Sequence, residues 1–300
     1  MVDKDKQLMV IIQRKLNIKK VAIVILLFVF LICSVLVIRN SIQKINSYKA
    51  YKQYEKQLQM IASQKEQGQA KSDSMHNLPV LTEQAKAEIE NIYHSDSKRV
   101  FITFDDGPST VTPQILDILK QENVKATFFV LGSRVEAQPD MVKRMYDEGH
   151  FIANHGYSHK YTSIYQSPQT VLDEFNKCNE AVKNAIQVPE YNSRLFRFPG
   201  GSVGGKYAEI KSQAIELLKQ NDIMYVDWNA LTGDAETNNL SIELEIKRLQ
   251  ETTSGRNSVV LLMHDAQAKR VTAEALPQII CYLKEQGYEF KNFYDIMRNI

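Results

Sequence analysis

Apolar runs of strand length alternate with amphipathic segments along the chain from about Lys98 onward. The apolar runs are 100–104, 126–132, 151–156, 195–201, 223–229 and 258–265. The segments with helical periodicity are 112–124, 139–150, 167–186, 208–222, 241–253 and 273–288. Repeated strand-then-helix units predict an α/β protein with a parallel sheet, and six or seven such units favour a barrel.

Polar side chains follow the predicted strands at the points where the strands end. They are Asp105, Asp106, His155, Arg197, Asp234, His264 and Asp265. In α/β barrels the catalytic residues lie at the C-terminal ends of the strands. We therefore expect these side chains to lie near one another.

Asp105 and Asp106 stand directly after the run 100–104 and directly before Gly107-Pro108. Successive strand side chains alternate between faces, so the two carboxylates point the same way only if the strand ends between them. Two neighbouring carboxylates repel, and both ionise readily only beside a compensating cation. The pair indicates a metal site or a base with a raised pKa; the alternative is a solvated turn, which Asp-Gly-Pro also favours.

His155 and His159 are four residues apart, a spacing at which one helical turn aims both imidazoles at one point. With Asp106 they make a three-ligand metal site that leaves a coordination position open. Such a site suits hydrolysis, because the bound ion polarises a carbonyl group and lowers the pKa of water toward about 7. Asp105 is the expected general base and His264 the expected general acid. Arg197 would keep Asp105 ionised.

Asp234 is expected to orient His264 and to stabilise its charge. This role and that of Arg197 depend on more than the spacing of the residues.

The N-terminal third has a different texture. Residues 1–20 are a polar tail, and 21–38 form an uncharged apolar run bracketed by Lys19-Lys20 and Arg39, which has the length of a transmembrane helix. Residues 39–97 are polar and are expected to form a helical or flexible stalk before a domain at 98–297. Basic residues are nearly balanced on the two sides of the apolar run, so charge alone barely sets its orientation.

Composition adds two limits. The chain has 37 basic and 35 acidic residues, a formal charge of +2, which gives no global attraction to nucleic acid. Cys33 lies in the apolar run, and Cys178 and Cys281 stand in no metal or redox motif, so we expect inert thiols.

Four motifs resemble those of the NodB-homology polysaccharide deacetylases, carbohydrate esterase family 4. They are TFDDGP at 103–108, HGYSH at 155–159, RFPGG at 197–201 and LLMHD at 261–265, in the order of that family. The resemblance covers roughly 98–293 and implies an irregular (β/α)7 barrel, with zinc as the usual metal. It implies the following roles: Asp105 as base, Asp106, His155 and His159 as ligands, Arg197 as brace of the base, and His264 as acid. It also implies that the backbone near Gly200 binds the oxyanion and that Leu262 lines the acetyl pocket.

One further motif of that family, the fourth along its chain and located between RFPGG and LLMHD here, differs in this sequence. It commonly reads Asp-x-x-Asp-Trp, whereas this chain has Leu231 and Ala235 in place of the first Asp and the Trp. Asp234 keeps the acidic position that is implied to tune His264. Trp228, the only Trp, either fills the missing wall of the pocket or is a core residue at a strand end. We expect altered substrate fit.

These observations favour a metal-dependent de-N-acetylase of N-acetylhexosamine. An anchored domain on a long stalk suits the cell wall, with peptidoglycan N-acetylglucosamine as the lead substrate, the N-terminus inside and the catalytic domain outside. The same chemistry admits N-acetylmuramic acid, chitin-type oligomers, an exopolysaccharide or O-acetyl esters. A wall-binding module without catalysis is the alternative from another class. The sequence does not specify the oligomeric state.

Overall fold

The computed structural model describes residues 78–237 and 240–297 of the 300-residue chain. The predicted tail at 1–20, the predicted transmembrane run at 21–38 and most of the stalk lie outside these residues. Within the described ranges, no helix is both long enough and apolar enough to cross a membrane. All of the described residues belong to one unit of the chain, Ser72–Ile300.

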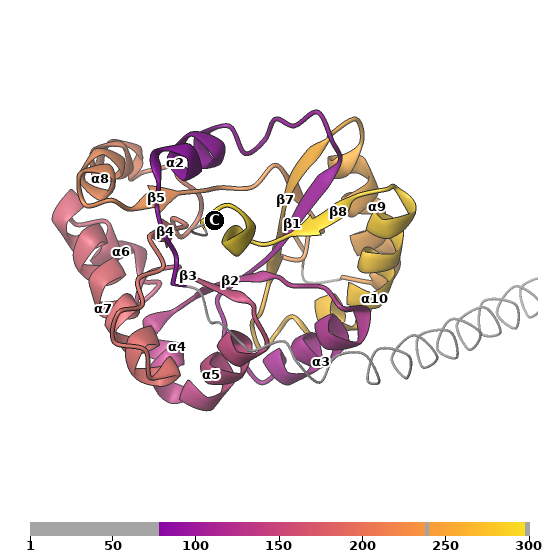
Figure 1. The fold of residues 1–300 in the computed structure, drawn as a ribbon, viewed down its shortest axis with the longest axis horizontal. Coiled ribbons are helices and arrows are strands. Elements are labelled where there is room, and N and C mark those ends of the chain that lie inside the picture. Colours follow the sequence, from indigo (N-terminus) through magenta and orange to yellow (C-terminus); the bar gives the residue numbers. More distant parts are fainter. Residues whose placement is uncertain (1–77, 238–239, 298–300) are drawn as a thin grey trace, which may run out of the picture. The chain divides into compact units, whose positions relative to one another are not determined.

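A curled sheet of eight strands, all joined in parallel, forms the centre of this unit (Figure 1). Its strands are β1 (Arg99–Asp105), β2 (Thr127–Val130), β3 (Phe151–Asn154), β4 (Leu195–Phe196), β5 (Met224–Tyr225), β6 (Ala230–Leu231), β7 (Ser258–His264) and β8 (Glu289–Lys291). The order is β5-β4-β3-β2-β1-β7-β6, and β8 pairs with the first half of β1. In the described part of the chain no strand pairing joins β5 to β6.

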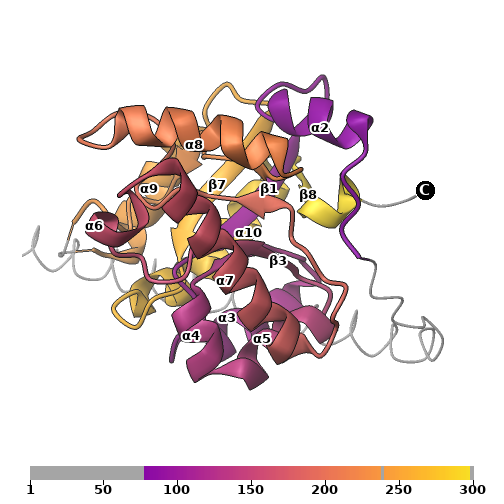
Figure 2. The ribbon, with the colours of Figure 1, turned by 90° about the vertical axis from the view of Figure 1, so that its left-hand side faces the viewer.

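Helices surround the sheet, as Figures 1 and 2 show. They are α2 (Glu83–Glu90), α3 (Thr112–Glu122), α4 (Gly132–Ala137), α5 (Pro139–Asp147), α6 (Tyr161–Ile164), α7 (Pro168–Ile186), α8 (Ala208–Gln220), α9 (Ile242–Thr253) and α10 (Arg270–Glu285), with a 3₁₀ turn at Phe293–Asp295. Figure 2 shows α7 beside α4 and α5, with which it packs.

The predicted α/β architecture is confirmed. Each of the six apolar runs contains a strand, and a helix follows each of them. The curled parallel sheet with its outer helices agrees with the expected irregular barrel. The sequence pattern did not indicate β6, whose two residues directly follow the run 223–229, or β8, whose three residues follow α10.

Alternation along β1 divides the core into two layers and sets the direction of its polar residues. Val100, Ile102 and Phe104 belong to the cluster under the outer helices, whereas Phe101 belongs to a second cluster with Phe129, Phe151 and Phe293. Asp105 is two pleats beyond Phe101, so it faces the same inner side. The site is therefore built on the inner face of the sheet at its C-terminal edge.

The second cluster also includes α2. Ala85 and Ile89 of this helix are buried with Met297 near the C-terminal end. The backbone N–H of Val80 donates to the carbonyl of Met297 at 2.8 Å. Part of the segment 39–97, assigned to the stalk, therefore packs with the domain.

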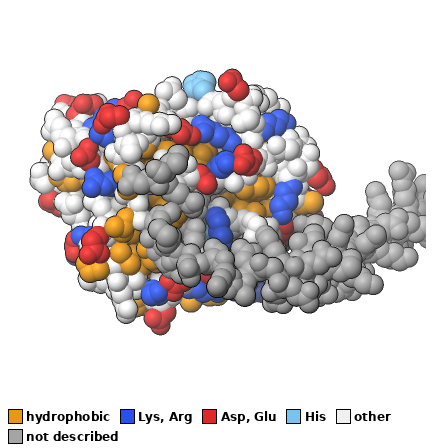
Figure 3. Space-filling model, in the orientation of Figure 1, with side chains coloured by type: hydrophobic (Ala, Val, Ile, Leu, Met, Phe, Trp, Pro, Cys, Tyr) orange, Lys and Arg blue, Asp and Glu red, His pale blue; other side chains and the backbone are white. Residues whose placement is uncertain are grey.

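Charged side chains of both signs are interspersed over the face of the unit drawn in Figure 3. This pattern agrees with the near-balance of 37 basic and 35 acidic residues in the whole chain. Cys178 and Cys281 are both free thiols.

Candidate active site

The end of β1 falls between the two adjacent carboxylates, Asp105 and Asp106. Asp105 is the last residue of the strand and is 2% exposed. Asp106 follows with φ of 72°, a left-handed conformation that turns the chain sharply. The strand ends between the two residues, as the alternation argument requires, so both carboxylates face the same region.

Arg197 holds Asp105 from the inner side of the sheet. Its guanidinium Nη1 donates to Asp105 Oδ1 at 2.8 Å and to Thr103 Oγ1 at 2.7 Å. Nε donates to the carbonyl of Val226, and Nη2 donates to the carbonyl of Asp227. A buried charge is tolerated when its partners satisfy it, and here a fully buried guanidinium neutralises a buried carboxylate.

His155 follows β3 directly, and His159 follows four residues later in a loop that leads to α6. The prediction that one helical turn aims both rings is therefore wrong. Gly156, with φ of 84°, and His159, with φ of 56°, bend the loop instead.

The side chain of Glu174 on α7 fixes the backbone of this loop. Its Oε2 accepts hydrogen bonds from the N–H groups of Tyr157 and Ser158, each at 2.7 Å. Its Oε1 accepts from the hydroxyl of Ser158, also at 2.7 Å. The carboxylate satisfies these two backbone N–H groups, so the loop is held without being helical.

Asp106, His155 and His159 converge. Asp106 Oδ1 lies 3.7 Å from His155 Nε2 and 3.4 Å from His159 Nε2. One ligand atom from each of the three residues lies within 4.8 Å of the others, close enough for one metal ion to contact all three. The structure thus brings together the three ligands that the sequence predicts.

Two observations show that this cluster fits a divalent cation. Asp106 Oδ1 is buried and has no hydrogen-bond partner among the described residues. His155 Nδ1 lies 2.8 Å from the carbonyl oxygen of Arg197, which only accepts, so Nδ1 carries the proton and Nε2 presents its lone pair to the cluster. A hydrogen bond of this kind typically orients a metal-binding histidine.

The electrostatics of the three residues agree with that fit. Burial lowers the pKa of His155, although Asp105 and Asp106 oppose the shift. Burial alone would raise the pKa of Asp106, but His155 and His159, followed by His264 and Arg134, bring it below its ordinary value. A neutral imidazole and an ionised carboxylate are the forms that bind a metal.

His264 ends β7 and lies beside Asp234. Its Nδ1 is 2.9 Å from Asp234 Oδ1, and its backbone N–H donates to Asp234 Oδ2 at 2.8 Å. Burial lowers the pKa of His264, but the hydrogen bond and charge of Asp234, with smaller contributions from Asp105 and Asp106, raise it to about 8. The predicted Asp234–His264 pair is present in the structure.

Asp265 connects β7 to the loop after β1. Its carboxylate accepts hydrogen bonds from Ser109 Oγ at 2.8 Å and Thr112 Oγ1 at 2.6 Å. A Cβ on Gly107 would lie 2.4 Å from Asp265 Oδ2, so glycine is required for this approach. Asp265 thereby fixes the loop that follows Asp106.

The residues expected to contact substrate are placed as follows. Gly200 has φ of 75°, and a Cβ there would lie 2.5 Å from the hydroxyl oxygen of Tyr161, a 39% exposed residue near His159. Leu262 is buried on β7. Trp228 is partly buried, packs against the inner cluster and lies near Gly201 and the guanidinium of Arg197.

The changed fourth motif takes two different positions. Leu231 lies on β6, opposite Leu262 of β7 in the strand register. Ala235 is exposed in the turn after Asp234. Both members of the Leu231–Leu262 pair are apolar. Ala235 supplies no indole at its position in the turn.

Sequence reasoning missed several residues that hold the site. They are Thr103, Tyr161, Glu174 and Asp227, the last of which accepts hydrogen bonds from the backbone and hydroxyl of Ser202. Thr103 was detectable, since a polar residue inside an apolar strand needs a partner. Glu174 was not, because its helix gives no sign of a loop many residues earlier.

Comparison with known proteins gives the family. The family described as "Polysaccharide deacetylase" matches residues 93–225. A peptidoglycan-N-acetylglucosamine deacetylase of Bacillus cereus is 30% identical over 224 residues, which cover 72% of this chain and 78% of that protein. The corresponding enzyme PgdA of Listeria monocytogenes is 38% identical over 195 residues, which cover 65% of this chain and 38% of PgdA.

A solved structure agrees. The catalytic domain of peptidoglycan N-acetylglucosamine deacetylase from Eubacterium rectale superposes with a TM-score of 0.61 at 32% identity and covers 66% of this chain and 90% of that domain. The resemblance drawn from the four motifs is confirmed, and the chain belongs to the polysaccharide deacetylase family, the NodB-homology enzymes of carbohydrate esterase family 4.

Proposed function

We propose that this protein removes the acetyl group from N-acetylglucosamine residues of peptidoglycan, using water and a divalent cation held by Asp106, His155 and His159. The observation that carries the proposal is the convergence of these three ligands beside a braced carboxylate, Asp105. Relatives named for this activity support the choice of substrate. The net reaction converts acetamide and water into acetate and a free amine.

Zinc is our proposed cation, because two imidazoles and one carboxylate form a common catalytic zinc site. When bound, such an ion acts as a Lewis acid on the acetamide carbonyl and makes water more acidic. The same donors accept other divalent metals, so the metal identity rests on the donor set and the family.

Asp105 is the proposed general base. Its Oδ1 is bound by Arg197, and its Oδ2 lies 3.8 Å from His155 Nε2, on the side of the cluster. Arg197 places a positive charge beside Asp105 and fixes the orientation of its carboxylate. Oδ2 can therefore take a proton from a water molecule beside the cluster as the water attacks the carbonyl carbon.

His264 is the proposed general acid. A pKa of about 8 keeps its ring protonated at neutral pH. Because Nδ1 donates to Asp234, Nε2 holds the proton that the departing amine requires. Asp234 holds the ring in this orientation and stabilises its positive charge.

Substrate binding is assigned to the surrounding wall. The backbone near Gly200 would donate to the developing oxyanion, and Leu262 would contact the acetyl methyl group. We place Trp228 beside the sugar, where it would take over part of the wall that lacks the fourth-motif indole. These assignments rest on the family resemblance together with the positions described above.

The cell-wall setting is part of the proposal. We propose that residues 21–38 anchor the protein in the cell membrane, with the N-terminus inside and the deacetylase domain outside. Thiol labelling of the full-length protein in intact cells tests this, after Cys33, Cys178 and Cys281 are changed to Ala. A single cysteine at exposed Val203 should react with an impermeant reagent, and one placed at Lys6 should not.

Acetate release by the purified full-length protein in detergent tests the chemistry. The substrates are peptidoglycan, oligomers of N-acetylglucosamine and an O-acetylated polymer, each with chelator or with added zinc. The proposal predicts zinc-dependent release of equal amounts of acetate and amine from peptidoglycan. No release from any polymer by zinc-loaded protein would favour a wall-binding module.

A further inference from the structure

A buried carboxyl group lies behind the Asp234–His264 pair. Glu245 of α9 is 0% exposed, and its Oε1 lies 3.1 Å from the hydroxyl oxygen of Thr272 on α10. The same hydroxyl lies 3.3 Å from Asp234 Oδ2. Thr272 thus bridges two carboxyl groups, one of which holds His264.

The hydrogen atoms available between Asp234 and Glu245 indicate which of the two carboxyl groups is protonated. A threonine hydroxyl has one hydrogen, so it can donate to only one of two ionised carboxylates. Asp234 accepts N–H groups on both oxygens. Glu245 Oε2 and the neighbouring Thr232 Oγ1 are both buried, and neither makes a hydrogen bond of ordinary geometry among the described residues. The arrangement is satisfied when Glu245 is protonated, donates to Thr272, and Thr272 donates to Asp234.

The charges that face Glu245 agree with this assignment. Burial and the charge of Asp234 raise the pKa of Glu245 to about 7, and the hydroxyl groups of Thr272 and Thr232 and the charge of Lys269 only partly oppose the shift. Lys269 donates to the carbonyl oxygen of Asp234. An ionised Glu245 would add a second negative charge behind Asp234 with little solvent to stabilise it.

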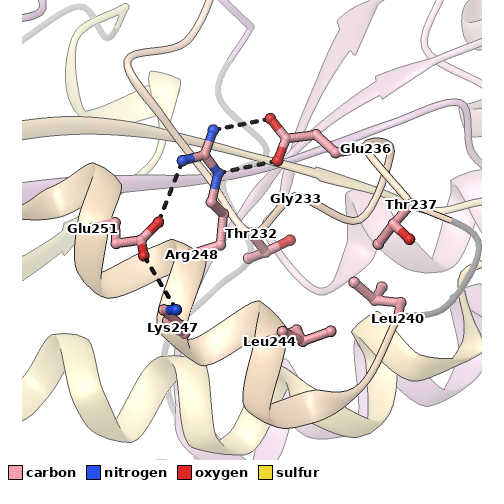
Figure 4. A pocket seen from close by; sticks show the side chains of 9 residues that line it. All are labelled: Thr232, Gly233, Glu236, Thr237, Leu240, Leu244, Lys247, Arg248 and Glu251. Atoms are coloured by element: carbon pink, nitrogen blue, oxygen red, sulfur yellow. Dashed lines mark hydrogen bonds and ion pairs between the residues drawn. The ribbon is translucent and has the colours of Figure 1, made fainter.

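Helix α9 also contacts the segment that carries Asp234, and Figure 4 shows the Arg248–Glu236 pair that joins them. Arg248 donates through Nε and Nη2 to the two carboxylate oxygens of Glu236, each at 3.0 Å. Thr252 Oγ1 donates to the carbonyl of Leu231 at 2.9 Å. One helix therefore contacts the chain on both sides of Asp234, through the backbone of Leu231 and the side chain of Glu236.

We propose that Glu245 acts in its protonated form as a positioning residue for His264, through Thr272 and Asp234. Its hydrogen bond sets the direction of the Thr272 hydroxyl, which then donates to Asp234 and keeps that carboxylate aligned with the His264 ring. The consequence for catalysis rests on the proposed function of His264, whereas the protonation state of Glu245 is independent of that function.

The test compares Glu245→Gln, Thr272→Val and Thr272→Ser in the full-length protein, with exposed Glu243→Gln on the same helix as the matched control. Carbon-13-edited infrared difference spectra at pH 6 should show a protonated carboxylic acid band that Glu245→Gln removes and Glu243→Gln retains. The pH dependence of unfolding gives a second measure. The pKa of Glu245 is raised from 4.5 to about 7 in the folded state, so the wild type should lose stability relative to Glu245→Gln as the pH rises from 4.5 to about 7, with little further loss above that pH.

Acetate release and NMR titration of the His264 ring then report positioning. Glutamine keeps a donor toward Thr272, so Glu245→Gln should retain kcat within about 3-fold and leave the His264 titration unchanged. Thr272→Val should lower kcat about 10-fold or more at similar KM and shift the titration of the ring, and Thr272→Ser should restore both.

Two results would overturn the inference. One is the absence of an acid band that depends on Glu245. The other is a lowered His264 pKa in Glu245→Gln, which would mean that Glu245 acts as an anion. If the wild type released no acetate, the proposed function would fail, and the infrared and NMR measurements would still decide the state of Glu245 and its effect on His264.

Discussion

The Nδ1 atom of His155 lies 2.8 Å from the main-chain carbonyl oxygen of Arg197, while the side chain of the same arginine binds Asp105. One residue therefore fixes the tautomer of a proposed metal ligand and braces the proposed base. The ends of β3 and β4 bring the two residues together because these strands are neighbours in the sheet. The proposed cation site and the proposed proton-transfer site therefore share Arg197 as a partner.

Replacing Arg197 with Met should destabilise the fold by about 3–5 kcal/mol, because the change leaves Asp105 buried without its partner. Urea unfolding of the metal-free protein measures this loss. Arg270→Met is the matched control, since Arg270 is 79% exposed and its ion pair with Glu274 should contribute less than about 1 kcal/mol. A cost for Arg197→Met as small as that of the control would show that Asp105 does not depend on Arg197.

Replacing Glu174 with Gln should weaken zinc binding by about 10–100-fold, because one acceptor for the loop that carries His159 becomes a donor. Competition with a chromophoric chelator measures the affinity. Glu180→Gln, on the same helix α7 but paired with Lys183 at the surface, should bind zinc as the wild type does. Equal affinity of the two variants would argue against a role for Glu174 in the site.

Folding stability should fall with decreasing pH because of His150, which lies buried at the end of the segment before β3. Burial, with smaller contributions from Lys125 and Arg144, lowers its pKa to about 3. The unfolded state therefore binds a proton below about pH 6.5, whereas the folded state does not. This difference lowers the free energy of unfolding by about 2 kcal/mol between pH 7 and pH 5. Unfolding of the wild type and His150→Asn across this range should show the stability difference between them shrinking by that amount.

Exposed His94→Asn is the control for the measurement on His150. It should change the pH dependence of unfolding little. Parallel pH profiles for wild type and His150→Asn would show that the buried ring is protonated in the folded protein, contrary to its burial.

Replacing Gly200 with Ala should cost about 1–2 kcal/mol of stability, because φ is 75° there. The Tyr161 hydroxyl that a Cβ would meet belongs to a partly exposed side chain and can move away. Gly204→Ala isolates the backbone effect, since Gly204 has φ of 72° and nothing within 4 Å of an added Cβ. Thermal unfolding should give similar costs for both variants, whereas deacetylation should fall in Gly200→Ala alone.

The strand-and-helix order could be predicted because the buried strands are short continuous apolar runs and the helices each carry an amphipathic pattern. Strand β8 could not, because its three residues, Glu289–Lys291, carry two charges and take their place only by pairing with β1. The packing of α2 with the domain could not be predicted either, because Ala85 and Ile89 are buried by contacts with residues near the C-terminus.

The candidate site could be predicted where its residues follow strand ends, since parallel strands bring those ends to one edge. Asp106 and His155 meet for this reason. The loop conformation of 155–159 could not be predicted, because it depends on Glu174 at a distant position on α7. Glu245 was hidden for the same reason, since its periodicity marks it as a buried helix position and only the fold shows what it faces.

Acetate release by Asp105→Asn, measured on protein shown to contain zinc, tests the central claim most directly. Asparagine keeps the shape of the side chain but cannot take a proton, so one equivalent of zinc should remain bound while the rate falls by about 10²–10⁴-fold. A rate close to that of the wild type, with zinc in place, would contradict the account.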